Sequence, residues 1–277
     1  MLAALDILAG LVLPERGVSQ NAKDIFELYA LILVMALVVF VGVEGTLIWF
    51  MIKFKARRGQ VAAQIHGNTR LEIGWTVGAA VILVFITIVT FIKLPGIKDP
   101  PASDIDADGN PVASATLLAS TDQPAVPKGA KLNIIVDGQQ YVWRYQYPRA
   151  NNKQVFAYEE MVVPVGMTVT LDITADDVVH SWWIPALGGK MDAVPGYTNK
   201  TWFKAEKAGV FEGQCAELCG RNHANMLARV RAVPFDEYQA WYDRQAADIA
   251  AARKAAAAER KRILDEEKRA AEQSESE

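Results

Sequence analysis

Cysteine and histidine are scarce in this chain of 277 residues, which contains two cysteines and three histidines. The formal net charge of −3 is too small to favour nucleic acid as a partner. The chain also lacks a glycine-rich stretch with the spacing of a phosphate-binding or dinucleotide-binding loop. These absences disfavour nucleic-acid-binding proteins and the nucleotide-dependent enzymes that use such loops.

Long apolar runs, by contrast, are present in the first third of the chain. Residues 29–52 are apolar apart from Glu44, and residues 73–92 carry no charge. Each run is long enough to cross about 30 Å of hydrocarbon as a helix. A pair of buried helices in a soluble core is the weaker alternative, because such helices are rarely this long. The sequence therefore predicts a transmembrane hairpin over residues 25–93.

The loop between the two runs sets the orientation of the hairpin. It contains basic residues and no acid, with Lys53, Lys55, Arg57, Arg58 and Arg70 as its cations. An excess of lysine and arginine marks the cytoplasmic side of a membrane. We therefore expect both termini, including the segment 1–24, on the extracytoplasmic side. That segment has no basic start and no convincing cleavage site, which favours a mature N-terminus over a cleaved signal.

Beyond the hairpin the composition changes twice. Residues 94–130 are rich in proline, glycine, alanine and aspartate and have no sustained period, which predicts a linker. Residues 131–234 contain short runs with the alternation of β-strands, at 132–136, 141–147, 155–163, 168–173, 201–204 and 228–232. Such a set predicts a sandwich or barrel. Residues 235–277 are rich in alanine and mixed charges and predict an exposed helical tail, either solvated or docked on a partner.

Both cysteines lie in the stretch GQCAELCGRNHANM, residues 213–226. An extracytoplasmic location permits a Cys215–Cys219 disulfide, but that pairing leaves His223 and Met226 without a role. A zinc site would recruit the distant His180 as a fourth ligand. Copper is favoured, because thiolate, imidazole and thioether together suit copper redox sites. Two thiolates can also bridge two copper ions, with one histidine for each ion.

These residues carry a resemblance to a known family. The sequence HSWWIP from His180, followed by the pattern C-x-E-x-C-x-x-x-H-x-x-M from Cys215, resembles the dicopper (CuA) motif of cytochrome c oxidase subunit II. The likeness covers residues 25 to 245. It implies an α+β membrane protein with a cupredoxin-like Greek-key β-barrel. The copper ligands that it implies are His180, Cys215, the backbone carbonyl of Glu217, Cys219, His223 and Met226.

The resemblance also implies a function. The chain would accept electrons from cytochrome c and pass them to haem in subunit I, where oxygen is reduced to water. This chain would then hold no catalytic residue of its own and no covalent haem, since both cysteines are committed to copper. Subunit I and subunit III would be its membrane partners, in a bacterial inner membrane with the dicopper domain on the periplasmic side. The carboxylate of Glu217 would bind a magnesium ion shared with subunit I.

Two further residues, Tyr141 and Glu72, stand at functional positions of the family. Tyr141 stands where a tryptophan usually receives the electron, so Tyr141 or the nearby Trp143 would be the point at which the electron enters. Core packing is the ordinary role of an aromatic residue such as Trp143 on a strand. Glu72 matches a carboxylate at the entrance of a proton pathway, and an acid that faces lipid headgroups is the alternative.

Two alternative functions stay open at the level of the sequence. Nitric oxide reductases with a dicopper subunit differ from oxidases in the partner chain. A membrane-anchored copper-binding or assembly protein would need the ligands but not the residues that face a partner, such as Glu72 and Glu217.

Overall fold

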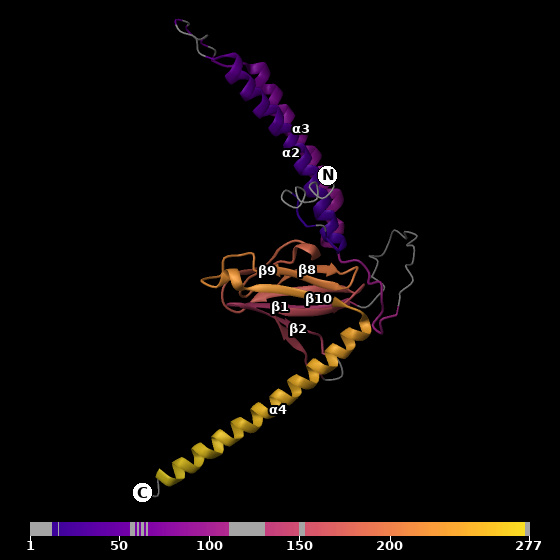
Figure 1. Cartoon of the computed structure of the whole chain (residues 1–277), viewed down its shortest axis with the longest axis vertical. Helices are drawn as coiled ribbons and strands as arrows, with labels where there is room; N and C mark the ends of the chain where they lie inside the picture. The colour runs from indigo at the N-terminus through magenta and orange to yellow at the C-terminus, as the bar shows by residue number, and fades with distance from the viewer. Residues whose placement is uncertain are drawn as a thin grey trace. The chain divides into compact units, whose positions relative to one another are not determined.

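The computed structural model describes residues 13–15, 17–55, 59, 61, 64, 66–110, 131–149 and 153–274. The chain divides into two compact units, Met1–Asp99 and Pro100–Glu277 (Figure 1). Two of the loop cations that support the predicted orientation, Arg57 and Arg58, lie outside the described residues. Most of the predicted linker, residues 111–130, also lies outside them.

The first unit is a helical hairpin of α2 (Gln20–Lys53) and α3 (Thr69–Lys98). The most apolar windows of the two helices have mean hydropathies of 2.6 and 2.5, and none of the residues in these windows is buried within the chain. Both helices are long and apolar enough to cross a membrane. The helices extend beyond the predicted spans 29–52 and 73–92 at both ends.

Polar contacts hold the ends of the hairpin. The Lys93 ammonium lies 3.0 Å from an Asp24 oxygen and 2.6 Å from a Glu27 oxygen, which joins α3 to the start of α2. At the start of α3, the Asn68 side chain accepts the Leu71 N–H, and Glu72 accepts the Asn68 N–H at 3.2 Å. These are reciprocal capping contacts, which satisfy backbone donors that the first turn leaves free.

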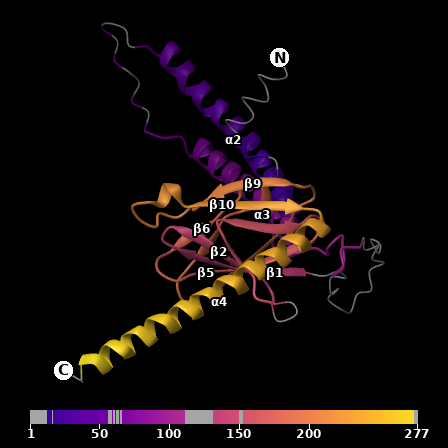
Figure 2. The ribbon, with the colours of Figure 1, turned by 60° about the horizontal axis from the view of Figure 1, so that its bottom comes forward.

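The second unit is a two-sheet β-domain. One sheet has the strand order β3-β2-β1-β5-β8 and the other has the order β4-β10-β9 (Figure 2). The strands are β1 (Lys131–Gln139), β2 (Val142–Gln146), β3 (Phe156–Tyr158), β4 (Glu160–Pro164), β5 (Thr168–Ala175), β8 (Asn199–Lys204), β9 (Gly209–Gln214) and β10 (Leu227–Val233). A separate two-stranded ribbon pairs β6 (His180–Trp182) with β7 (Met191–Ala193).

The topology places strands distant in sequence side by side. β1 runs parallel to β5, and β10 runs parallel to β4, while the other ladders are antiparallel. The chain therefore crosses between the two sheets, as in a Greek-key sandwich. Alternate residues point inward, so the fully buried side chains form one core that includes Ile134, Val136, Trp143, Tyr145, Met161, Leu171, Ile173 and Phe203. This confirms the predicted cupredoxin-like class.

The strand predictions need two corrections. The predicted run 155–163 is two strands, because Glu159 has a left-handed φ of 63° that interrupts the extended backbone between β3 and β4. The pattern also missed β6, β7 and β9. Two of them have only three residues, which is too short for an alternation to be recognised.

The chain ends in α4 (Phe235–Ser274), with its first turns packed on the β-domain. Tyr238, Tyr242, Ala246 and Ile249 recur on one face of the helix and are buried. The Tyr242 hydroxyl donates to the Pro148 carbonyl at 2.9 Å. From residue 250 to residue 269 every side chain is exposed, and this part of α4 extends past the strands in Figure 2. The predicted exposed tail is thus a helix with a docked first third.

Candidate metal centre

The predicted copper ligands come from two separate places in the β-domain. His180 is the first residue of β6, whereas the other five lie in the loop between β9 and β10. Backbone hydrogen bonds tie the loop to β6: the Gln214 N–H donates to the Trp183 carbonyl and the Ala216 N–H to the Ser181 carbonyl. The Cys215 N–H donates to the Met226 carbonyl at 2.9 Å, which closes the loop on itself.

The structure brings the donor atoms of all six residues together. The sulfur atoms of Cys215 and Cys219 are 3.8 Å apart, whereas a disulfide requires about 2.05 Å. Each sulfur faces one imidazole: Cys215 lies 3.9 Å from His180 Nδ1, and Cys219 lies 3.4 Å from His223 Nδ1. Both cysteines are free thiols.

Each thiol also has a second, weaker neighbour. The Met226 sulfur lies 3.9 Å from the Cys219 sulfur, and the Glu217 carbonyl oxygen lies 3.3 Å from the Cys215 sulfur. Two thiols thus form the centre, and each has one imidazole and one weak donor at its side. This soft donor set fits copper better than it fits a hard cation such as magnesium.

Most of this site is shielded from water. His180 and Met226 are fully buried, and Cys215 and Cys219 are buried as well. His223 is half-buried, and the Glu217 side chain is exposed although its carbonyl points to Cys215. Among the described residues, one group of metal-ligating side chains has its ligand atoms within 4.8 Å of one another, and it consists of His180, Cys215 and Cys219.

The protonation of the two thiols differs. Burial disfavours the thiolate at Cys215, but hydrogen bonds with His180 and the neighbouring backbone outweigh it and lower its pKa to about 6. Burial and the nearby charge of Cys215 raise the pKa of Cys219 to about 11. One thiolate therefore forms readily at neutral pH, and the second needs a cation beside it. Metal binding at this site should release a proton.

Asp177 holds the ring of His180 in place. One of its oxygens lies 2.8 Å from His180 Nε2 and also accepts the Val178 N–H. Its other oxygen accepts the Gln140 N–H at 2.7 Å. A carboxylate can only accept, so Nε2 carries a proton, and Nδ1, which faces Cys215, is the ring nitrogen available to bind a metal. The net effect on Asp177 is a lowered pKa: burial disfavours its carboxylate, but these hydrogen bonds stabilise the carboxylate by more.

The sequence analysis assigned Asp177 and Gln140 no role at the metal site. The Gln140 side chain donates to the Cys219 carbonyl at 2.7 Å, so this residue contacts both halves of the site. The available signal was the spacing D-x-x-H from Asp177 to His180, since an acid three residues before a ligand can reach back to its ring in a turn. No comparable signal in the sequence marks Gln140.

The two aromatic residues proposed for electron transfer, Tyr141 and Trp143, differ in their burial. Tyr141 is half-buried in the turn between β1 and β2. Its hydroxyl would lie only 2.6 Å from a Cβ atom at Gly220, the residue after Cys219. Trp143 is fully buried, and its ring centroid lies 5.8 Å from that of His180. Both therefore adjoin ligand residues, but of the two Tyr141 has the greater contact with solvent.

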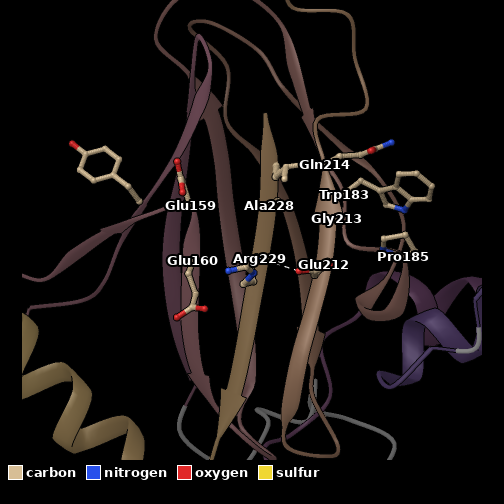
Figure 3. Close-up of a pocket in the computed structure, with 11 residues that line it drawn as sticks. Glu159, Glu160, Trp183, Pro185, Glu212, Gly213, Gln214, Ala228 and Arg229 are labelled. Carbon is tan, nitrogen blue, oxygen red and sulfur yellow. Dashed lines mark hydrogen bonds and ion pairs between the residues drawn. The ribbon is translucent and has the colours of Figure 1, made fainter. Parts of the chain in front are cut away.

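An open groove of about 550 Å³ lies over the sheet β4-β10-β9 (Figure 3). Its lining includes Glu159, Glu160, Glu212 and Arg229, and none of the predicted copper ligands. Arg229 and Arg231 both lie on β10. Glu212 pairs with Arg229 at 3.2 Å, and Glu160 pairs with Arg231 at 2.9 Å. Glu160 and Glu212 are therefore paired within the chain. Because the groove contains none of the predicted ligands, it is a separate feature from the metal site.

The fold and the site together define a class: a membrane-anchored cupredoxin-like domain with a thiolate- and imidazole-rich metal site. Comparisons with known proteins agree. The family model of the cytochrome c oxidase subunit II periplasmic domain matches residues 149–233, and that of the subunit II transmembrane domain matches residues 9–92. The chain belongs to the cytochrome c oxidase subunit II family.

Individual relatives are similar over most of the chain. A cytochrome c oxidase subunit 2 of Alkalihalophilus pseudofirmus is 36% identical over 79% of this chain, which spans 57% of that relative. A probable cytochrome c oxidase subunit 2 of Rickettsia bellii is 33% identical, with 80% of each chain covered. Among solved structures, the periplasmic domain of subunit II of cytochrome oxidase of Bradyrhizobium japonicum has 39% identity and a TM-score of 0.40, over 42% of this chain and 94% of that one.

Proposed function

We propose that this chain accepts electrons from cytochrome c on the periplasmic side of a bacterial inner membrane and passes them to haem in subunit I of an oxidase. The observation that carries the proposal is the paired arrangement of the site, in which two thiols 3.8 Å apart each face one histidine. Two copper ions held by these residues would supply one-electron redox chemistry.

The residues of the chain would divide the work as follows. Cys215 and Cys219 would hold the metals as thiolate ligands, and His180 and His223 would hold them as imidazole ligands. Met226 and the Glu217 carbonyl would be weak ligands, one on each side, next to the thiol that each contacts in the structure. Asp177 would orient His180, and the buried surroundings would exclude water.

The electron would enter through Tyr141. Half-buried at the surface of the domain, it can meet a donor protein, and its hydroxyl lies against the glycine that follows Cys219. Trp143 is enclosed by the core and would act from inside, against His180. We propose this division because a donor cytochrome cannot reach a fully buried side chain.

Two carboxylates complete the proposal. The exposed Glu217 side chain would bind a magnesium ion together with subunit I, while its backbone carbonyl serves copper. Glu72 would mark the entrance of a proton pathway. In the structure it also caps α3 by accepting the Asn68 N–H, so a substitution there should be tested for helix stability as well as for proton uptake.

The direct test uses the full-length chain in detergent, loaded with copper. We expect two coppers per chain and an EPR spectrum of one unpaired electron shared equally between them. The matched control, Cys215→Ser, should lose that spectrum. A wild-type chain that binds a single copper, or zinc alone, would contradict the proposal.

A further inference from the structure

Glu44 is a carboxylate within the apolar part of α2. It lies nine residues before Lys53 and seventeen after Glu27, which at 1.5 Å per residue is about 13 Å and 25 Å along the helix. A glutamate side chain cannot span either distance to reach the membrane surface. Glu44 is therefore held at the depth of the hydrocarbon once α2 crosses a membrane.

Within the described part of this chain, Glu44 makes no side-chain hydrogen bond and no ion pair. The Thr46 hydroxyl, two residues away, donates back to the Gly42 carbonyl of its own helix. Lys93 of α3 is bound to acids at the other end of α2. On α3, the residues that line the same groove, Ile82 and Ile86, have apolar side chains without a donor.

A carboxylate without a donor is unfavourable at this depth. A charged residue at the centre of a transmembrane helix is costly in hydrocarbon, and such residues usually face other helices and pair there. Hydrocarbon offers no hydrogen bond to either protonation state. Because the described part of the chain supplies no donor, the carboxyl group needs one from elsewhere.

The structure also shows where that donor can approach. A groove of about 470 Å³ runs between α2 and α3, lined by apolar side chains with Glu44 at its margin. Its walls include Val39, Phe40 and Val43 from α2 and Ile82 and Ile86 from α3. The groove is thus apolar along its length and has one polar group.

We propose that this groove is the docking site for a transmembrane helix of a partner subunit, which places a side-chain donor against Glu44. The partner helix is apolar where it faces Val39, Val43 and Ile86, and carries one hydroxyl, amide, imidazole or basic group at the level of Glu44. Lipid alone satisfies the apolar wall but not the carboxyl group. The inference rests on the proposed function, in which the chain is one subunit of a membrane complex.

Photocrosslinking in the assembled complex tests the location of the partner. A photoreactive amino acid at Val43 or at Ile86, in the groove, should give an adduct with another membrane subunit. The matched control is Val38, which is 69% exposed on α2 and is not part of the groove. We expect its adducts to be with lipid. Lipid adducts alone from both groove positions would overturn the proposal.

Two substitutions test the donor. Glu44→Gln keeps a hydrogen-bonding group and should leave the chain bound to its partner subunits after detergent extraction. Glu44→Leu suits the hydrocarbon better but removes the acceptor, and should weaken that association roughly three- to fifteen-fold, as for interhelical hydrogen bonds in membranes. Association of Glu44→Leu equal to that of the wild type would refute the role of Glu44.

A separate readout distinguishes this inference from the proposed function. Glu44 lies in a different unit from the metal ligands, so both variants should keep the copper EPR spectrum of the wild type. A wild-type chain without that spectrum would refute the proposed function and leave the crosslinks as the test of the groove. Loss of the spectrum in Glu44→Leu alone would show that Glu44 acts on the metal site and would overturn the docking role assigned to this residue.

Discussion

Replacement of Asp177 by asparagine tests whether the metal site depends on a residue that is not itself a ligand. Both oxygens of Asp177 accept N–H groups: one from His180 and Val178, the other from Gln140. Asparagine keeps the shape but offers an oxygen on one side only. Its NH₂ group must therefore face an N–H donor, either that of His180 or that of Gln140.

The size of the effect follows from what is lost. A hydrogen bond to a charged group contributes about 1.5–3 kcal/mol. Removal of the outer partner of a metal-bound histidine typically costs about 10–100-fold in metal affinity, which is a similar free energy. We expect Asp177→Asn to weaken copper binding within that range, and to change the EPR hyperfine pattern because the His180 ring is no longer fixed. Competition with a copper chelator at fixed pH measures the affinity.

The neighbouring substitution Asp176→Asn is the control. Asp176 accepts the Gln139 side chain at 2.6 Å, and an amide oxygen can replace that acceptor. We expect its copper affinity to stay within about twofold of the wild type, as for an ordinary surface substitution. Equal copper affinities and spectra for Asp177→Asn and the wild type would refute the reasoning.

Four further outcomes are expected. Cys215→Ser should abolish the shared-electron EPR signal, whereas Met226→Leu should retain two coppers with a shifted reduction potential, measured by redox titration. Tyr141→Ala should slow electron transfer from cytochrome c in stopped-flow experiments and leave the copper spectrum unchanged. Burial raises the pKa of Asp137 above its ordinary value near 3.8, although Arg144 acts to lower it. The protonated carboxyl therefore stabilises the fold below pH 3.8, and this stability is lost as the pH rises through the raised pKa. Asp137→Asn should therefore remove a slope of at most about 1.4 kcal/mol per pH unit from the unfolding free energy between pH 3.8 and the raised pKa, and an unchanged pH profile would contradict this.

Much of the architecture was predictable because the signals are local. The apolar runs 29–52 and 73–92 predict α2 and α3 by length alone, since a helix long enough to cross hydrocarbon needs no tertiary context to be recognised. Alternation predicted β5 and β10 for a similar reason. The three-residue strands β6 and β7 could not be predicted, because they form through pairing with each other and with the loops around the metal site.

For the metal site, the sequence by itself determined the donor types and the spacing of Cys215, Cys219, His223 and Met226. These lie within one turn-rich loop, so their proximity follows from the connectivity of the chain. Only the tertiary structure decided the other half. His180 comes 35 residues earlier, and it meets Cys215 because backbone hydrogen bonds tie the loop to β6.

The tertiary structure also decided what surrounds the ligands. Asp177, Gln140 and Trp143 are ordinary residues in the sequence, and the packing of β1, β2 and β6 at one end of the domain brings them against His180 and Cys219. Glu44 is the opposite case. Its presence in an apolar run was visible from the sequence, but its lack of a partner among the described residues is a property of how α2 and α3 pack. Composition determines which groups need partners, and only packing determines which of them remain without one.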